Sequence, residues 1–577
     1  MPGIMGIISE KKKLENINIL DTFHKEPSVS YLIDSARFSK AYFCRLSVNK
    51  FQNDKIFKRI GKNLISTEGI ILNSKYLLHQ YKTKNLSELI LKLYRLHDLK
   101  LFEKLRGNFS GFIYYNNKLI VFTDHYASKS IYYFFNEESK VMIFSSELKV
   151  VVKIMKELGY SPHLDIQGAY CLLTLGFMLG DLTLVEGVKK LPPGNILIYK
   201  DGQINLEEYY RISCEPNIEE DEEEIIKELD KRFREAVKLE YEKDLEYGYS
   251  HIATLSAGLD SRTNVAYAKK IGVNNLTCFT FSESGYLDEN IAKKICSDNH
   301  FEFIFYALDN GDYLIKNIDD IISSNDGLVL YSGSAHLYNC LRKISLHHFG
   351  LIHTGLIGDV ALGAYLQNKK HNINNNKMLN KISCSTKLIN ILEKIVNNNQ
   401  FEYENDELFA FYVRSVNGLF NGFRMIEQFT EFCSPTLYVD FFDYAIKINP
   451  KLRYKEVIYL KWINKSIPKF TRYIWEKHGL PPKWPILLLE TYTKARALKR
   501  NITMKYNPRY SMIPFEYWWR NNNDLKNKIN KIFDNNINFI QNENLKENCN
   551  SLFVKGTLKE KTQIITLLKA VKMLNIS

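Results

Sequence analysis

Short apolar runs separated by turn residues follow one another through the first third of the chain, which predicts β-strands. Four of these runs lie at residues 69–72, 109–114, 119–122 and 195–199, and most are bounded by glycine, asparagine, aspartate or proline. Residues 191–194, Leu-Pro-Pro-Gly, form a rigid turn that cannot lie inside a helix or a central strand. The pattern therefore predicts a β-rich first domain that ends at about residue 210.

The pattern changes after this point. An acidic stretch at residues 219–224 precedes helical spacing from Ile225 to about Glu240, and acidic residues favour a helix N-terminus because they complement its dipole. Beyond residue 250, apolar runs at 252–255, 276–281 and 301–306 alternate with a small-residue loop at 256–261 and a helical segment at 264–270. Strands that alternate with helices predict a parallel sheet flanked by helices.

Two later segments differ from this α/β pattern. Residues 367–408 are rich in asparagine and lysine and predict a solvated insertion with helical pieces. The tail from about residue 490 is helical, aromatic and basic, and it ends in an amphipathic stretch from Gln563 to Leu574. We therefore predict three domains at residues 1–210, 220–480 and 481–577, the last a helical C-terminal extension.

Composition narrows the class of protein. The chain has 577 residues, is 45% apolar and 25% charged, and contains no apolar run of the ~18 residues that a membrane span needs. Nine cysteines lack CxxC spacing and histidine partners, which argues against zinc and against a disulfide framework and favours reduced cysteines in the cytoplasm. The net charge of +13 comes from lysines mixed with asparagines throughout, so it does not favour a nucleic-acid partner.

The small-residue loop at residues 256–261 carries the clearest chemistry. Its sequence, Ser-Ala-Gly-Leu-Asp-Ser, lies between a predicted strand and a predicted helix. Small side chains let backbone amides approach a phosphate chain, and a helix N-terminus adds donors and a favourable dipole. Ser256 and Ser261 offer hydroxyl donors. Asp260 would repel phosphate unless a divalent cation lay between them, which makes it a candidate Mg²⁺ ligand.

This loop resembles the pyrophosphatase loop (PP-loop) of the ATP pyrophosphatases, and the chain as a whole resembles the asparagine synthetase family. Further landmarks of that family follow in the expected order over residues 1–480, at residues 105–112, 123–133, 145–149, 189–194, 354–365 and 435–450. The resemblance implies an α+β sandwich of the Ntn-hydrolase type, then an α/β PP-loop domain of the adenine nucleotide α-hydrolase type and the helical extension. Asparagine-synthetase-like proteins of surface-polysaccharide clusters are also similar, including at residues 261–262 and 475–479.

The resemblance implies an AMP-forming amide ligase that uses ATP and Mg²⁺. A substrate carboxylate would attack the α-phosphorus, pyrophosphate would leave, and an amine or ammonia would then attack the mixed anhydride. Asp260 and Asp359 would hold Mg²⁺. A lysine would stabilise the developing charge; Lys455 is our choice, with Lys461 as its competitor.

The same resemblance implies where ATP binds. The adenine would lie near Leu255 and Phe281, and the phosphates would lie on the PP-loop. The residues implied to bind ATP are Leu255, Ser256, Gly258, Asp260, Ser261, Phe281, Thr354 and Gly355.

Four positions depart from the family pattern. A glutaminase of this type needs a cysteine directly after the initiator methionine, but Pro2 stands there, so we expect a retained domain without glutaminase activity. Ala257 replaces the first glycine of the PP-loop and is tolerable only if its backbone φ is negative. In the second loop, residues 354–359, which resembles the family's second ATP-site loop, Leu356 replaces a glutamate and Ile357 a glycine. A leucine cannot take a proton or position ammonia, which puts aspartate plus ammonia in doubt as the reaction.

Several functions stay open at this point. The nucleophile is an amine already present in the substrate if the chain acts like β-lactam synthetases or lasso-peptide cyclases, which also vary at the position of Leu356. A PP-loop enzyme that modifies RNA and a catalytically inactive scaffold also stay open. The expected partners are a small-molecule, sugar-acid or peptide carboxylate and a separate source of ammonia or amine. No membrane span and no nucleic acid are expected, and a homodimer is compatible with the resemblance.

Overall fold

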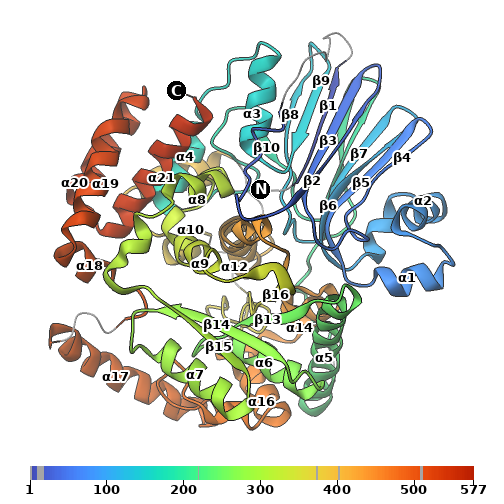
Figure 1. Ribbon diagram of the computed structural model, residues 1–577. Coiled ribbons are helices and arrows are strands. Elements are labelled where there is room, and N and C mark those ends of the chain that lie inside the picture. The colour runs from blue at the N-terminus through green and yellow to red at the C-terminus, as the bar shows by residue number, and fades with distance from the viewer. Residues whose placement is uncertain are drawn as a thin grey trace.

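The computed structural model describes residues 3–9, 19–218, 220–371, 375–399, 403–506 and 511–576. Figure 1 shows two neighbouring sheets from the first part of the chain at the upper right and a third sheet below them, with helices around all three. Within the described residues, every helix is too short or too polar to cross a bilayer.

Two six-stranded sheets, with orders β10-β8-β9-β1-β3-β2 and β12-β11-β7-β6-β5-β4, form the first domain. Their neighbouring strands are antiparallel. The predicted apolar runs fall in β5, β6, β7 and β11, which confirms these strands. The strands are β1 (Gly3–Ser9), β2 (Tyr31–Arg37), β3 (Ala41–Val48), β4 (Phe57–Ile60), β5 (Asn63–Ile71), β6 (Gly107–Tyr115), β7 (Lys118–Thr123), β8 (Tyr132–Asn136), β9 (Val141–Ser145), β10 (Lys189–Lys190), β11 (Asn195–Lys200) and β12 (Gln203–Glu208).

The two sheets pack face to face through apolar side chains. Phe43 of β3 stacks on Phe112 of β6 with ring centroids 4.8 Å apart. Helices α1 (Ser74–Gln80) and α2 (Leu86–His97) bury leucines against the outer face of one sheet, and α3 (Leu148–Glu157) covers strands β8 and β9 of the other. Because strands direct alternate side chains to opposite faces, these layers bury apolar side chains on both faces of each sheet. This arrangement confirms the predicted α+β sandwich.

A five-stranded sheet with the order β15-β14-β13-β16-β17 forms the core of the second half. All its strand pairs are parallel, as predicted. The strands are β13 (Ser250–Thr254), β14 (Leu276–Ser282), β15 (Glu302–Ala307), β16 (Phe349–His353) and β17 (Phe432–Cys433). The helices that precede, connect or flank them are α5 (Glu222–Glu246), α6 (Leu259–Lys270), α7 (Leu287–Asn299), α8 (Ile318–Asn325), α9 (Ala335–Leu341), α14 (Val439–Lys447), α15 (Pro450–Arg453) and α16 (Val457–Ser466).

The asparagine-rich segment at residues 367–408 packs more closely than expected. It contains α10 (Asn375–Ile382), α11 (Ile389–Asn398) and α12 (Asp406–Ala410), and α13 (Asn421–Phe423) follows it. Leu379 and Leu392 are fully buried, because α10 packs on α12 and α11 packs on α4 (Ile166–Leu175). The prediction of a solvated insertion is therefore wrong for the inner faces of these helices.

The last helix is also more buried than its sequence indicates. The C-terminal helices are α17 (Ile486–Tyr506), α18 (Phe515–Asn521), α19 (Asn523–Asn536), α20 (Glu543–Lys555) and α21 (Leu558–Leu574). Helix α21 lies between α4, α8, α19 and α20. Gln563, on its polar side, donates to the carbonyl oxygens of Leu172 and Leu173 at 3.0 and 3.1 Å. The predicted amphipathic stretch therefore has a polar side that partners partly cover: Gln563 and Thr566 are buried, whereas Lys572 is exposed.

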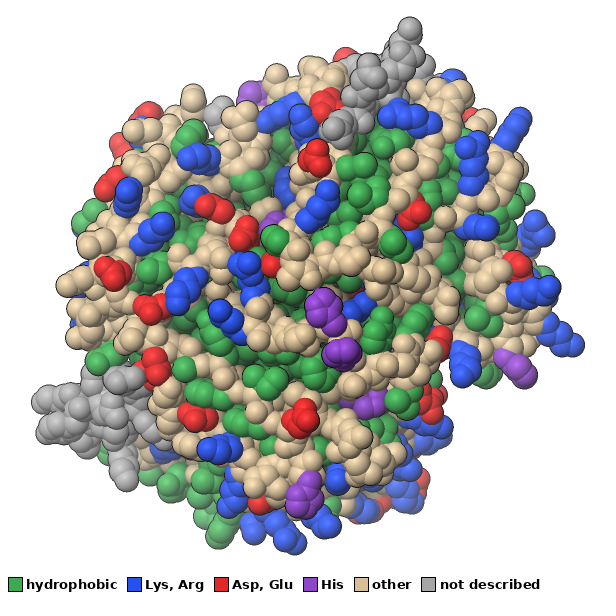
Figure 2. All heavy atoms as spheres, in the orientation of Figure 1, with side chains coloured by type: hydrophobic (Ala, Val, Ile, Leu, Met, Phe, Trp, Pro, Cys, Tyr) green, Lys and Arg blue, Asp and Glu red, His purple; other side chains and the backbone are tan. Residues whose placement is uncertain are grey.

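Basic residues are dispersed rather than gathered on the face of the molecule that Figure 2 draws. Figure 2 shows lysine and arginine side chains spread over this face of the molecule, with acidic side chains between them. Many of the exposed ones pair locally, such as Lys227 with Glu224 and Lys153 with Glu157. On this face the net charge of +13 does not form one basic patch.

Candidate active site

A cavity of about 650 Å³ lies at the carboxyl ends of β13 and β16. In parallel sheets this edge is where ligands bind, because loops and helix N-termini converge there. Both predicted loops line the cavity. The residues that line the cavity and were also predicted from the sequence are Ser256, Gly258, Asp260, Ser261, Thr354, Gly355 and Asp359.

The first loop is held in shape by its own hydroxyl groups. The Ser256 amide donates to Ser261 Oγ at 3.0 Å, and the Gly258 amide donates to Ser256 Oγ at 3.1 Å. The Ala257 amide donates to Asp288 Oδ1 at 2.8 Å. Ala257 is absent from the residues with positive φ, so its methyl group causes no backbone strain. Helix α6 begins at Leu259, which places Asp260 in its first turn.

The second loop packs directly on the first. A Cβ added at Gly355 would lie 2.2 Å from the Ser261 amide nitrogen, and one added at Gly358 would lie 2.5 Å from Asp260 Cγ. Asn264 of α6 also donates to the Thr354 carbonyl oxygen at 2.8 Å. Glycine is therefore required at both positions for the two loops to meet. Contact between the loops is what brings Asp359 to the same cavity as Asp260.

Asp260 and Asp359 are partly buried carboxyl groups in an acidic setting. Burial and the neighbouring Asp359 raise the pKa of Asp260 well above its ordinary value. Burial and Glu456 raise the pKa of Asp359 to about 6. Tyr459 donates its hydroxyl to Asp260 Oδ1 at 3.0 Å, but this donor is neutral and does not balance the negative charge. A divalent cation would relieve the repulsion.

The donor set at this pair fits Mg²⁺ rather than a fully protein-bound metal. Mg²⁺ in nucleotide sites is held by one or two carboxylates, with phosphate and water oxygens completing the octahedron. Among the described residues, neither Asp260 nor Asp359 belongs to a group of three potential metal ligands within 4.8 Å. A Mg²⁺ ion that also binds phosphate takes one or two protein carboxylates, so this pair suffices without a third protein ligand.

Several predicted residues do not line the cavity. Lys455 extends to Glu490, with Nζ 2.5 Å from Oε1, and its side chain is 44% exposed. Its competitor Lys461 pairs with Glu222 at 2.6 Å. Phe281 packs on the ring of His336 with centroids 4.5 Å apart, and Leu255 is buried beneath the loop. The places of the adenine and of the catalytic lysine therefore stay predictions.

Three other cations line the cavity and were not predicted: Lys381, Arg414 and Lys477. Lys477 forms an ion pair with Glu456, which also lines the cavity. The segment that carries Lys477 is fixed to the PP-loop, since the Glu476 amide donates to the Ala257 carbonyl oxygen at 3.1 Å.

Arginine 262 strengthens this attachment. The buried Arg262 side chain donates to the carbonyl oxygens of Ala257 and Ile474 at 2.8 and 2.7 Å, and so joins the PP-loop to the segment before Lys477. The sequence carries a signal here, because residues 261–262 and 475–479 both belong to the resemblance. That signal marks the two segments without indicating that they meet.

Comparison with known proteins decides the family. The family model for a glutamine amidotransferase domain matches residues 1–210, and the family model for asparagine synthase matches residues 228–424. Glutamine-hydrolyzing asparagine synthetase 1 of Bacillus subtilis is 23% identical over 263 residues, and the probable enzyme of that name in Acanthamoeba polyphaga mimivirus is 28% identical over 281 residues. The chain belongs to the asparagine synthase family. This confirms the resemblance seen in the sequence.

The matches to individual members of the asparagine synthase family are partial. They cover 44% of this chain and 40% of the Bacillus subtilis protein, and 46% of this chain and 48% of the mimivirus protein. A putative asparagine synthetase of Methanocaldococcus jannaschii is 27% identical over 40% of this chain and 45% of its own length. The chain thus matches less than half the length of these relatives.

Two solved structures are distantly similar to this chain. An allosteric regulatory enzyme of purine biosynthesis has a TM-score of 0.26 and 10% identity, over 52% of this chain and 80% of its own. The glutamine phosphoribosylpyrophosphate amidotransferase of B. subtilis has a TM-score of 0.24 and 10% identity, over 52% of this chain and 65% of its own. At these scores neither structure supports a conclusion about this chain.

Pro2, which stands where the family pattern has cysteine, lies outside the described residues.

Proposed function

We propose that this chain is an ATP-dependent, AMP-forming amide ligase that adenylates a carboxylate substrate for attack by an amine or ammonia. The observation that carries the proposal is the convergence of the two loops on one cavity with a pair of destabilised carboxylates, Asp260 and Asp359. A cavity lined by small residues at the end of a parallel strand suits the phosphates of ATP. Membership of the asparagine synthase family supports the same reaction class.

Each part of the cavity has a role in this reaction. Ser256 and Ser261 would bind the phosphates through their hydroxyl donors, Gly258 would allow close approach, and Asp260 and Asp359 would hold Mg²⁺. A bound Mg²⁺ supplies charge neutralisation at the phosphates. An oxygen of the substrate carboxylate forms a bond to the α-phosphorus of ATP and pyrophosphate leaves. The amine then forms the amide bond and AMP leaves.

The cation that stabilises the developing charge has two candidates. Lys455, predicted from the sequence, would have to leave Glu490 and turn toward the cavity. Lys477 already lines the cavity and is held there by its ion pair with Glu456. A preorganised cation contributes more to catalysis than one that must reorganise. We therefore assign Lys477 the larger role, with Lys455 as the alternative.

The second loop bears on the nature of the nucleophile. Leu356 lines the cavity, and its side chain can neither accept a proton from ammonia nor hold it. This favours a substrate that brings its own amine, as in an intramolecular amide former of the β-lactam synthetase or lasso-cyclase kind. Lys381 and Arg414 line the cavity without an ion-pair partner among the described residues and would attract an anionic group of the acid. We also propose that Pro2 leaves the N-terminal domain without glutaminase activity.

The test is an exchange assay between pyrophosphate and ATP with a panel of small, sugar and peptide carboxylic acids. Asp260→Asn and Asp359→Asn should abolish exchange, because each removes a Mg²⁺ ligand, whereas Asp319→Asn at an exposed site should not change it. Lys477→Ala should lower kcat by about 10²- to 10³-fold, the usual cost of one transition-state donor. Lys455→Ala should have a smaller effect. The proposal fails if no acid supports exchange, and a larger loss in Lys455→Ala than in Lys477→Ala would reverse the assignment.

A separate assay tests the N-terminal domain. Purified protein should release no glutamate from glutamine, because Pro2 offers no thiol. Glutamate release in the absence of any other protein would contradict this part of the proposal without affecting the ligase.

A further inference from the structure

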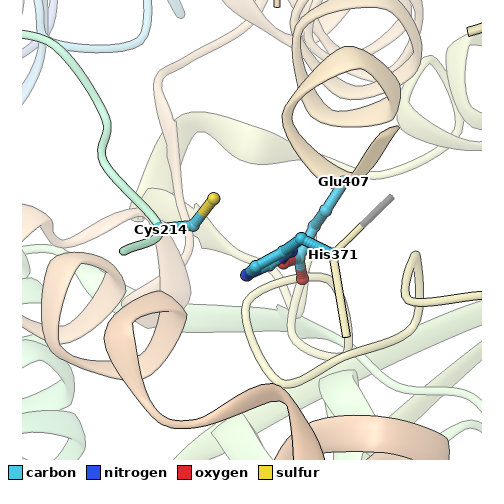
Figure 3. A group of neighbouring side chains, drawn as sticks. All are labelled: Cys214, His371 and Glu407. Carbon is cyan, nitrogen blue, oxygen red and sulfur yellow. Dashed lines mark ion pairs between the residues drawn. The ribbon is translucent and has the colours of Figure 1, made fainter. Parts of the chain in front are cut away.

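A second group of potential ligands lies outside the ATP cavity. Three ligand atoms lie within 4.8 Å of one another: the sulfur of Cys214, a ring nitrogen of His371 and a carboxylate oxygen of Glu407. Figure 3 shows the three side chains converging from separate segments. Cys214 lies between β12 and α5, His371 follows the second loop, and Glu407 belongs to α12. Nothing in their spacing along the sequence marks them as a group.

The ring nitrogens of His371 lack the partners that buried polar atoms normally have, although the side chain is partly exposed. Both of its ring nitrogens are buried, and neither makes a hydrogen bond. Its Nδ1 is 3.6 Å from Glu407 Oε2, too far for a good hydrogen bond but close enough for both atoms to bind one ion. A buried polar atom without a partner needs an explanation, and an ion is one of the few that apply.

Cys214 has a donor aimed at its sulfur. The side chain is buried, and the sulfur accepts a hydrogen bond from Asn405 Nδ2 at 2.8 Å. Asn405 is itself fixed, because its Oδ1 caps α12 through the Leu408 amide at 3.0 Å. A hydrogen bond donated to the sulfur stabilises a thiolate, which is the form that binds metal.

Glu407 is oriented by an arginine behind it. Arg453 donates to both carboxylate oxygens, at 2.6 and 3.0 Å, and both side chains are fully buried. A carboxylate has about four acceptor positions, so these two bonds leave room for a metal ion. Partners of this kind commonly fix the orientation of a metal ligand.

We propose that Cys214, His371 and Glu407 form a binding site for a transition-metal ion of the zinc class. Sulfur, imidazole and carboxylate ligands together suit Zn²⁺, whereas Mg²⁺ and Ca²⁺ take oxygen ligands. Three protein ligands leave the fourth tetrahedral position for water or another molecule. The ligands come from segments far apart in the sequence, which is why the absence of paired CxxC or HxxH spacing is no argument against this site.

The site also has a mechanical connection to the ATP cavity. Arg453 donates to the Ala361 carbonyl oxygen at 3.4 Å. A Cβ added at Gly363 would lie 2.2 Å from the Arg453 carbonyl oxygen, so the two segments are in close contact. The chain on both sides of this contact carries Asp359 and Glu456 to the cavity. A metal ion at Glu407 would therefore stabilise the segments that hold the cavity. This connection, unlike metal binding itself, rests on the proposed function.

The test measures metal binding by the full-length chain, freed of metal by a chelator and titrated with Co²⁺. Co²⁺ commonly replaces Zn²⁺, and a thiolate ligand gives it a charge-transfer band in the near ultraviolet. Wild-type protein should bind one equivalent and show the band, and Zn²⁺ should displace the Co²⁺. Cys214→Ser should lose the band, and His371→Ala, at a partly exposed position, should weaken binding at least tenfold while remaining folded by circular dichroism.

Two control variants decide whether the signal comes from this site. Cys384→Ser changes a partly exposed cysteine outside the group and should retain the band. Cys433→Ser changes the buried group of Glu240, His353 and Cys433 and should also retain it. The proposal is overturned if wild-type protein binds no Co²⁺, if Cys214→Ser keeps the band, or if only Cys433→Ser loses it. Because no arm measures ligase activity, failure here is distinguishable from failure of the proposed function.

Discussion

Ile357 in the second loop has a backbone φ of 61°, in the left-handed region that favours glycine. For a β-branched residue this conformation costs about 1–2 kcal/mol, so it persists only where the surroundings impose it. The side chain is 4% exposed, and its burial offsets the strain. The neighbouring Gly355 and Gly358, which touch the first loop, leave the backbone little freedom to relax.

Substitution at this position should give an unusual order of stability. Ile357→Ala and Ile357→Gly both lose the buried side chain, at a cost of about 2–5 kcal/mol. The glycine variant should nevertheless be more stable than the alanine variant by about 1 kcal/mol, because only glycine adopts positive φ without strain. Urea denaturation measures both. At the adjacent Leu356, where φ is not positive, alanine should be the more stable variant, and the same order at both sites would contradict the explanation.

Single residues can be predicted where the chemistry is contiguous in the sequence. Asp260 belongs to a contiguous string of small residues after β13, and Asp359 to a contiguous stretch that resembles the family's second ATP-site loop; both line the cavity. The position of Lys477 depends on a contact between Arg262 and the Ile474 carbonyl oxygen, which are 212 positions apart, so no local pattern reveals it. Lys455 is suggested by its distance from a landmark in the sequence, and that distance says nothing about the direction of a side chain.

At the scale of elements, types can be predicted better than boundaries and surroundings. The predicted apolar runs lie in strands of two of the three sheets, but α6 begins at Leu259, five positions before the predicted Asn264. The small polar residues of the PP-loop suggest a turn, although aspartate and serine also suit the first turn of a helix. Helix α21 looks one-sided in sequence, whereas α4 and Ser385 cover some of its polar groups in the structure.

The start of α21 depends on a capping box. The Thr557 hydroxyl accepts from the Glu560 amide at 3.3 Å, and Glu560 Oε2 accepts from the Thr557 amide at 2.8 Å. Thr557→Ala should reduce the free energy of unfolding by about 1 kcal/mol, since an N-terminal amide loses its acceptor. The midpoint of urea denaturation should fall at an unchanged m-value. Thr557→Ser keeps the hydroxyl and should stay near wild type; equal losses in both variants would show that the methyl group, not the cap, is responsible.

At the scale of the whole molecule, the two halves are joined by buried charges. Glu431, before β17, lies 2.7 Å from Lys55 Nζ and 2.8 Å from Lys129 Nζ of the N-terminal domain. Lys149 reaches Asp326 at 3.1 Å. None of these pairs can be predicted, because each partner alone resembles an ordinary surface charge in the sequence. The sequence therefore does not predict how the two halves are oriented, although it predicts the fold class of each half.

Removal of the central charge should strongly destabilise the molecule. Glu431→Ala leaves Lys55 and Lys129 with one carboxylate partner each, Glu68 and Glu427 at 3.3 and 3.2 Å, so the loss should approach without exceeding the ~3–5 kcal/mol that an unpaired buried charge costs. Thermal and urea unfolding measure the loss.

An exposed ion pair provides the control for this comparison. Glu208→Ala, which breaks an exposed pair with Arg211, should cost less than about 1 kcal/mol. Similar small losses in Glu431→Ala and Glu208→Ala would mean that the buried pairs contribute no more than surface ones.

The pH dependence of stability gives an independent measure of the same contact. Burial alone would raise the pKa of Glu431, but the ammonium groups of Lys129 and Lys55 lower it from 4.5 to about 2. A carboxyl group with a lowered pKa contributes stability above its unfolded value, and that contribution disappears as pH falls from about 4.5 toward 2. Glu431→Gln should therefore lose part of the wild-type acid sensitivity in this range while being less stable at neutral pH. If the stability curves of wild type and Glu431→Gln stay parallel from pH 7 down to the acid transition, Glu431 is not the charge that joins the halves.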